Sequence, residues 1–177
     1  MSILKVNTIQ DKGGNTLLVS DGAGTISSGG AITNTPAFEA SLSSNQTISS
    51  GTATKVQFNQ ENLDTDNNYD NSTNYRFTPT TAGKYFVFLD IGINTNADSN
   101  MNDNHCFIYK NGSIEKRSHF NFRANAPRFG TVSLSTIIDL NGTDYIEAYA
   151  ECNDSSGSPT IQASPYTRFG AYKLIGA

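Results

Sequence analysis

The chain of 177 residues has no tryptophan, only two cysteines and little charge. Charged residues make up 16% of it, against 36% hydrophobic residues, which is enough apolar material for one core. Cys106 and Cys152 are too few for a disulfide scaffold or, by themselves, for a zinc site. We therefore expect two reduced thiols packed as small apolar side chains. The length allows one ordinary domain with an extension.

Basic patches and long apolar runs are missing as well. The formal net charge is −4 and Lys and Arg are scattered thinly, so we expect no nucleic-acid partner. No stretch approaches the roughly 20 apolar residues that a membrane-spanning helix needs. Residues 1–5 lack an apolar run of signal-peptide length, so we expect no membrane insertion and synthesis in a cytoplasm.

Asn, Ser, Thr and Gly fill the sequence instead, and these residues favour turns over helices. From Pro36 onward, short strand-like runs are separated by clusters of Asn, Asp, Gly or Pro, and no segment keeps a helical period over three turns. The pattern predicts an all-β, antiparallel fold, either a sandwich or a jelly roll. The strands are expected near residues 36–42, 53–59, 73–79, 83–94, 104–110, 113–119, 128–140, 144–152 and 166–175.

Strict alternation shows which side of several strands faces the core. The Asn111-Gly112 pair, between two strand-like runs, predicts a hairpin because both turn residues must tolerate a positive φ. The side chains expected to point inward are Val132, Leu134, Ile138 and Leu140 in one strand and Ile146, Ala148, Ala150 and Cys152 in the next.

Strand 83–94 is apolar on both sides. Tyr85, Val87 and Leu89 suit the core, yet Phe86 and Phe88 point the other way and are equally apolar. Each Phe left in water forgoes roughly 2 to 3 kcal/mol of burial, so we expect a second buried surface, either an oligomer interface or the cover of a long loop. Residues 106–109 are likewise apolar on both sides of their strand. The predicted interface residues are Phe86, Phe88, Phe107 and Tyr109.

Residues 1–35 differ from the rest and are expected to form a β-hairpin and a linker, ahead of a head domain at 36–177. Two short strands, near residues 3–10 and 16–19, flank the turn signal Lys12-Gly13-Gly14-Asn15, and the connector 27–31 follows. A two-stranded hairpin is marginal in water, so this one must pack on another chain, a partner or copies of itself. The predicted docking residues are Ile3, Leu4, Val6, Ile9, Leu17 and Leu18.

No catalytic constellation stands out, so we expect no enzyme, no catalytic residues and no cofactor. His105 and His119 have no motif partner for a triad or a zinc site. The loops 64–70 and 96–103 offer oxygen ligands of the kind calcium uses, but their spacing favours solvated loops. Loop tyrosines beside Asn and Asp suggest a glycan-binding surface as an alternative: Tyr69, Tyr75 and Tyr166.

Residues spread over 36–177 resemble a known family of β-sandwich heads. Leu140–Ile146 resembles the family's loop into its penultimate strand, Phe169–Leu174 its closing strand, and Tyr109–Gly112 its central hairpin. The spacing from Tyr69 to Phe77 is one residue longer than usual, and Val87 and Leu89 stand where aromatics are common. The order of Phe58, Asp64, Tyr69, Phe77, Gly83 and Tyr85 resembles the signature of the globular heads of complement component one, subcomponent q.

That jelly roll is shared with the tumour necrosis factor superfamily. The resemblance implies a tight homotrimer around an axis lined with apolar side chains. It therefore agrees with the two-sided apolar strand 83–94.

The segments 4–11, 14–18 and 20–24 resemble a leader of virion proteins of tailed phages, especially marine phages infecting cyanobacteria. The resemblance implies a virion structural protein, made in the host cytoplasm, that contacts other capsid or tail proteins through this leader. Residues 20–35 are short for a shaft, which favours a capsid decoration or short head fibre. The alternative is a tail fibre or receptor-binding tip that contacts host surface glycans. A depolymerase, a third class, is not expected.

Overall fold

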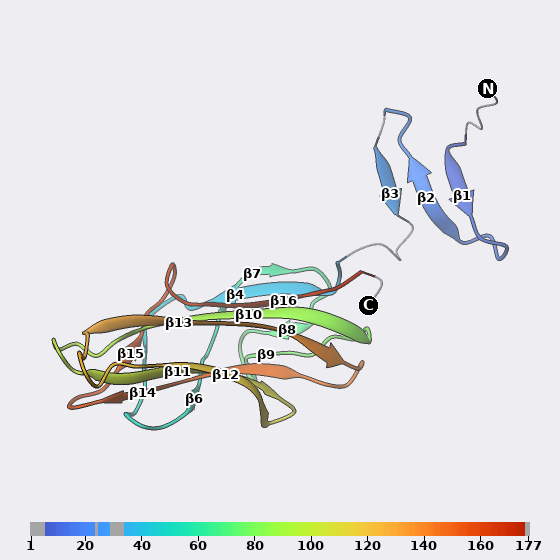
Figure 1. Cartoon of the computed structure of the whole chain (residues 1–177). Coiled ribbons are helices and arrows are strands. Elements are labelled where there is room, and N and C mark those ends of the chain that lie inside the picture. Colours follow the sequence, from blue (N-terminus) through green and yellow to red (C-terminus); the bar gives the residue numbers. More distant parts are fainter. Residues whose placement is uncertain (1–5, 24, 29–33, 176–177) are drawn as a thin grey trace. The chain divides into compact units, whose positions relative to one another are not determined.

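The computed structural model describes residues 6–23, 25–28 and 34–175. The chain divides into two compact units, an N-terminal one that reaches Asn34 and a head formed by Thr35–Leu174 (Figure 1). Every regular element in the described part is a strand. None of these residues forms a helix that could cross a membrane.

The N-terminal unit is a small antiparallel sheet of β1 (Thr8–Gln10), β2 (Thr16–Ser20) and β3 (Ile26–Ser28), in that order. The Asp11 carboxylate accepts hydrogen bonds from the backbone and side-chain amides of Asn15 and closes the first turn.

The third strand of this sheet was not expected, because its Ser-rich sequence is typical of a flexible connector. The Asp21 carboxylate accepts hydrogen bonds from the backbone N–H groups of Ala23 and Thr25. This contact tightens the second turn and returns β3 alongside β2. Of the residues predicted for docking, Ile3 and Leu4 lie outside the described residues.

The head is a sandwich of two antiparallel sheets. The first, here called the β10 sheet, has the order β5-β15-β10-β16-β4-β7, with β13 also paired to β10. The second, the β11 sheet, has the order β12-β11-β14-β9-β8, with β6 also paired to β14. The strands are β4 Ala37–Ser41, β5 Gln46–Thr47, β6 Thr54–Lys55, β7 Gln60–Asp64, β8 Tyr69–Asp70, β9 Arg76–Phe77, β10 Gly83–Asn94, β11 Met101–Lys110, β12 Ser113–Asn121, β13 Phe129–Leu140, β14 Ile146–Asp154, β15 Thr160–Ile161 and β16 Arg168–Lys173.

The inward side chains of both sheets meet in one core. The alternating residues predicted to point inward on β13 and β14 are buried, and so are Tyr85, Val87, Leu89, Ile91 and Ile93 of β10. The hairpin between β11 and β12 also forms as predicted, with positive φ angles of 51° at Asn111 and 79° at Gly112. The alternation of apolar residues therefore identified the buried side of the long strands correctly.

An aromatic cluster fills one part of the core. The ring of Phe38 stacks on Tyr69 and Phe77 at centroid distances of 4.7 and 4.5 Å and meets Phe169 edge-on at 5.0 Å. The buried Tyr85 ring meets Phe77 at 5.8 Å. The tyrosine hydroxyls are satisfied, since those of Tyr69 and Tyr85 donate to the backbone carbonyls of residues 58 and 81.

Replacement of Phe38 by Ala should destabilise the head strongly, because it removes the ring that contacts three other aromatic residues of the core. Deletion of a buried Phe side chain typically costs about 3 to 5 kcal/mol. Urea denaturation should show this loss as a lower midpoint. The matched control is Phe120→Ala, because that ring is half exposed and should change stability by only about 0.5 kcal/mol. Equal effects of the two substitutions would contradict the assignment of Phe38 to the core.

Candidate functional site

The outer face of the β10 sheet carries Phe86 and Phe88, the first two residues predicted for an interface. The Phe86 ring lies against Tyr172, with 5.4 Å between ring centroids. Phe88 lies over Gly170, where an added Cβ would sit only 2.3 Å from the Phe88 Cζ atom. Both rings are consequently half-buried within one chain, rather than fully left in water as the sequence pattern suggested.

This surface is nevertheless incompletely covered. Ile137, the partner of Phe86 across the strand pair, is 57% exposed. We call Phe86, Phe88, Ile137 and Tyr172 the apolar face. Beside these residues lies a hollow of about 480 Å³. The residues that line the hollow are Phe86, Phe88, Asp90, Ser133, Leu134, Ser135, Arg168 and Tyr172.

One ion pair borders the apolar face. The Arg168 Nε atom lies 2.7 Å from the Asp90 Oδ2 atom, and its guanidinium lies 5.4 Å from the centre of the Phe88 ring. The hydrogen bond to Asp90 and the charge of that carboxylate raise the pKa of Arg168. The charges at this edge are thus already paired within one chain.

Phe107 and Tyr109, the other two predicted interface residues, lie on the outer face of the opposite sheet. Phe107 is only 4% exposed, because its ring packs between His105 and Tyr109. Tyr109 in turn stacks on Tyr149 at 4.1 Å. The four residues predicted for one interface therefore lie on opposite sides of the head and do not form a single surface.

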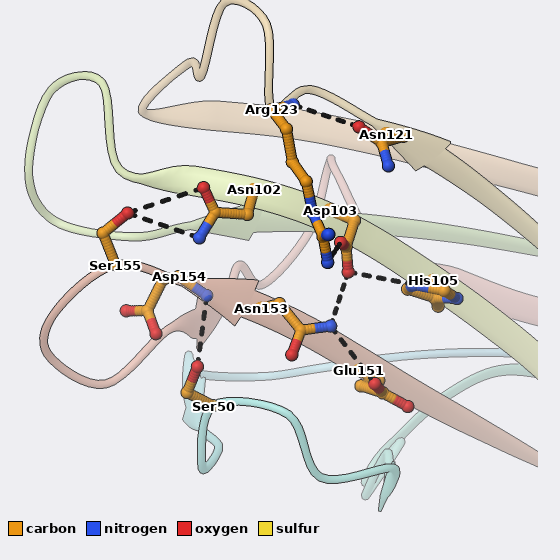
Figure 2. Close-up of polar contacts among 10 residues, drawn as sticks. All are labelled: Ser50, Asn102, Asp103, His105, Asn121, Arg123, Glu151, Asn153, Asp154 and Ser155. Atoms are coloured by element: carbon orange, nitrogen blue, oxygen red, sulfur yellow. Dashed lines mark hydrogen bonds and ion pairs between the residues drawn. The ribbon is translucent and has the colours of Figure 1, made fainter.

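A polar network at one end of the head is centred on Asp103, which is buried (Figure 2). Its carboxylate contacts the His105 Nε2 atom and the Arg123 Nη2 atom, both at 3.1 Å, and accepts a hydrogen bond from Asn153. Burial acts to raise the pKa of Asp103, but the hydrogen bonds from Asn153, His105 and Arg123 outweigh it and hold the pKa below its ordinary value. The network ties the loop after β12 to β11 and β14.

The two histidines belong to this end of the head and contact each other. His105 and His119 face each other across β11 and β12, with their rings stacked at 5.0 Å. Across the described residues, no group of three or more His, Cys, Asp or Glu side chains is placed to hold a metal ion.

The acidic loop 64–70 uses its carboxylates in its own turns. Asp64 accepts the backbone N–H of Tyr69. The backbone N–H of Thr73, together with those of Ser72 and Asn74, lowers the pKa of Asp70 strongly. These carboxylates cap turns, and the expectation of solvated loops without calcium stays a prediction.

Cys106 and Cys152 are free and buried. Burial raises the pKa of each thiol to about 12. Both side chains therefore pack as small apolar groups, as the sequence analysis expected.

Exposed aromatic rings gather at the end of the sandwich opposite the chain's entry at Thr35, and we call them the distal rings: Phe120, Phe129 and Tyr166. Phe120 and Tyr166 are each 51% exposed, and Phe129 meets Tyr166 at 5.1 Å. An added Cβ at Gly92 would lie 2.7 Å from the Tyr166 Cβ atom and 3.3 Å from the Phe129 ring. The glycine thus lets the two rings lie on the sheet.

Sequence reasoning missed Phe120 and Phe129, although Tyr166 was noted. For Phe129 the available signal is Gly92 inside a long strand, since a strand glycine marks a close approach. No comparable signal points to Phe120. Of the other tyrosines suggested for a glycan surface, Tyr69 is buried in the aromatic cluster and is not available. Tyr75 lies in the left-handed region at φ 50°.

The predicted docking residues of the small sheet differ in how exposed they are. Val6, Ile9 and Leu17 are exposed, and Leu18 is half-buried.

Comparison with known proteins gives the fold of the head. The sequence matches no protein-family model, and no curated protein matches it. Solved structures do match. Eiger TNF from S. frugiperda has a TM-score of 0.59 at 10% identity, over 80% of this chain and 93% of that one. The head has the jelly-roll fold of TNF and C1q-like domains.

Two further structures match this jelly-roll head equally broadly. Murine APRIL, determined at pH 5.0, has a TM-score of 0.57 at 13% identity and covers 78% of this chain and 98% of its own. The globular domain of zebrafish complement 1qA protein has a TM-score of 0.55 at 14% identity. The match covers 78% of this chain and 97% of that one. The resemblance to this fold noted in the sequence is thereby confirmed for the head.

Replacement of Asp103 by Asn should destabilise the head by about 1 to 3 kcal/mol at pH 7, because it weakens charge-assisted hydrogen bonds in a buried network. Since the folded pKa of Asp103 lies below the ordinary value of 3.8, its stabilisation is present above that value and is lost as pH falls through the folded pKa.

Denaturation curves of both proteins at a series of pH values would measure this. The difference between them should be constant near neutral pH and shrink below about pH 4. A difference that does not shrink as the pH falls below about 4 would contradict a role for the ionised carboxylate. Asp98→Asn, at an exposed loop position, is the matched control.

Proposed function

We propose that the protein is a non-enzymatic structural protein of a tailed-phage virion, a capsid decoration or short head fibre. In this proposal three copies of the jelly-roll head assemble as a homotrimer, and the N-terminal unit attaches them to the particle. The observation that carries the attachment role is the small sheet β1–β3, in which the side chains of Ile9 and Leu17 are each 45% exposed. Its resemblance to the leader of phage virion proteins supports the same role.

The apolar face of the β10 sheet is the surface we propose for trimer contacts. It combines exposed Ile137 with the half-buried rings of Phe86 and Phe88 and a hollow between them. Small side chains, Ser133 and Ser135, border the hollow and leave room for a neighbour. Covering such a surface lowers the free energy, since burial of apolar area drives association.

The outer face of the β11 sheet is less suited to this role. Phe107 is already covered within its own chain, and the ion pair between Lys55 and Glu147 lies beside Tyr149. Placing a partner here would remove water from charged groups, which is costly. Of the two outer faces, that of the β10 sheet is therefore the better candidate for trimer contacts.

Phe86→Asp should dissociate the trimer, because it would place a charge without a partner inside the contact. Light scattering should show the mass of one chain in place of three. Tyr109→Asp is the matched comparison, since it puts the same charge on the outer face of the other sheet and should leave the trimer mass unchanged. If only Tyr109→Asp lowers the mass, the trimer uses the other face. An unchanged mass for both variants would contradict the assignment of the trimer contact to either face.

Deletion of residues 1–30 should leave a soluble trimer that no longer joins particles, because the head unit is complete without the small sheet. Purified particles from an infection with the truncated gene should lack the protein by mass spectrometry. Labelled full-length protein imaged on intact particles should lie on the capsid. Incorporation of the truncated head, or label confined to the tail, would contradict the attachment role or the capsid location respectively.

The distal rings favour a second candidate function, a receptor-binding tip. Exposed aromatic rings offer flat apolar surfaces with polar edges, which suit the faces of sugar rings. Phe120 and Tyr166 are exposed at the end of the head away from Thr35. Purified head should then block phage adsorption to host cells, and Phe120→Ser with Tyr166→Ser should abolish the block. Absence of any block would leave the capsid role as the better reading.

A further inference from the structure

The small N-terminal sheet carries apolar side chains on both of its faces. Ile9 lies directly opposite Leu18 in the β1–β2 pair, and Thr8 opposite Val19. Because side chains alternate along a strand, Ile9 and Leu18 share one face, whereas Leu17 lies on the other. Ile9 and Leu17 are each 45% exposed. The sheet therefore has no interior of its own, and each face needs a cover.

Its edges are open as well. In the part of the chain that the structure describes, β1 and β3 each pair with β2 alone. An open strand edge is a template for pairing with another chain. A single flat partner would cover one face of the sheet and leave the other face and both edges in water. Copies arranged around an axis can cover one face and both edges at once, with β1 of one copy beside β3 of the next.

The face of Ile9 and Leu18 suits the inside of such an arrangement. These two apolar side chains stand on neighbouring strands and form a continuous strip, with a hollow of about 290 Å³ beside them. On the other face Leu17 and Val19 stand on one strand, and the residue across from Val19 is the polar Thr8.

The proposed head trimer would hold three such sheets within reach of one another. Copies related by a three-fold axis release their N-terminal units at the same end. Only residues 29–34 separate Ser28 from Thr35, and six residues span at most about 20 Å. Short tethers of this kind raise the effective concentration to about the millimolar range.

We propose that the N-terminal sheets of three copies pack on one another through the face of Ile9 and Leu18, before any virion protein is bound. The opposite face, with the exposed Leu17, then remains for the virion protein. This inference rests on the trimeric head proposed above. In this inference the first partners of the N-terminal sheet are the N-terminal sheets of the other two copies.

The test uses the purified full-length protein without other virion proteins and a spin label at Lys12→Cys, in the turn between β1 and β2. Cys106 and Cys152 are buried and should not take up the label. Pulsed electron paramagnetic resonance should give one narrow distance between labels. Ile9→Ser combined with Leu18→Ser should broaden it, while Thr8→Ser, a polar exchange on β1, should not.

Hydrogen exchange gives a second readout that does not depend on the label. Backbone amides of β2 should exchange at least tenfold more slowly in the unsubstituted protein than in the Ile9→Ser, Leu18→Ser variant. Leu17→Ser should keep this protection and lose incorporation into particles.

The outcomes separate the two proposals. A broad distance in a protein that is trimeric by light scattering would overturn the packing of the sheets and leave the trimeric head intact. A monomer would overturn the head trimer, on which the packing rests. A narrow distance that survives in the Ile9→Ser, Leu18→Ser variant would overturn the assigned face.

Discussion

The structure of the head depends on one strand that is apolar on both sides. The inward side chains of β10, from Tyr85 to Ile93, are fully buried against the β11 sheet. Its outward rings, Phe86 and Phe88, find partial cover from Tyr172 and from the bare backbone at Gly170. The strand pairs along its whole length with β13, and residues 85–90, half of its length, pair with β16. Both neighbours are thus positioned by a strand that a single chain covers fully on one side and partly on the other.

Much of this fold could be predicted from local patterns. The bounds of β10 and the inward sides of β13 and β14 follow from strict alternation, and the Asn111-Gly112 turn follows from its need for positive φ. The edge strand β7 was missed, because its sequence, Gln60–Asp64, has no alternating apolar side and its residues are largely exposed. Edge strands are fixed by pairing with a neighbour, and a polar sequence carries little sign of that pairing.

The surfaces could be predicted less well, because they depend on which sheet each strand joins. Phe86 and Phe107 have the same local pattern, a ring on the outward side of an apolar strand. Only the topology shows that β10 and β11 belong to different sheets, so that their outward sides face opposite directions. Whether an outward ring is covered depends on its particular neighbours. Phe107 lies between the rings of His105 and Tyr109, whereas Phe88 depends on the absence of a side chain at Gly170 on another strand.

The glycines of the β10 sheet show how such a surface is built from small residues. Gly170 admits the Phe88 ring, and Gly92 admits Phe129 and Tyr166 at the far end of the same face. A glycine inside a strand weakens the strand by itself, since it loses more backbone entropy on folding and packs no side chain. The rings that lie over these glycines restore the buried area. They remain partly exposed on the outer face of the sheet, so the arrangement that completes the packing of the single chain also leaves apolar area whose further burial would be favourable.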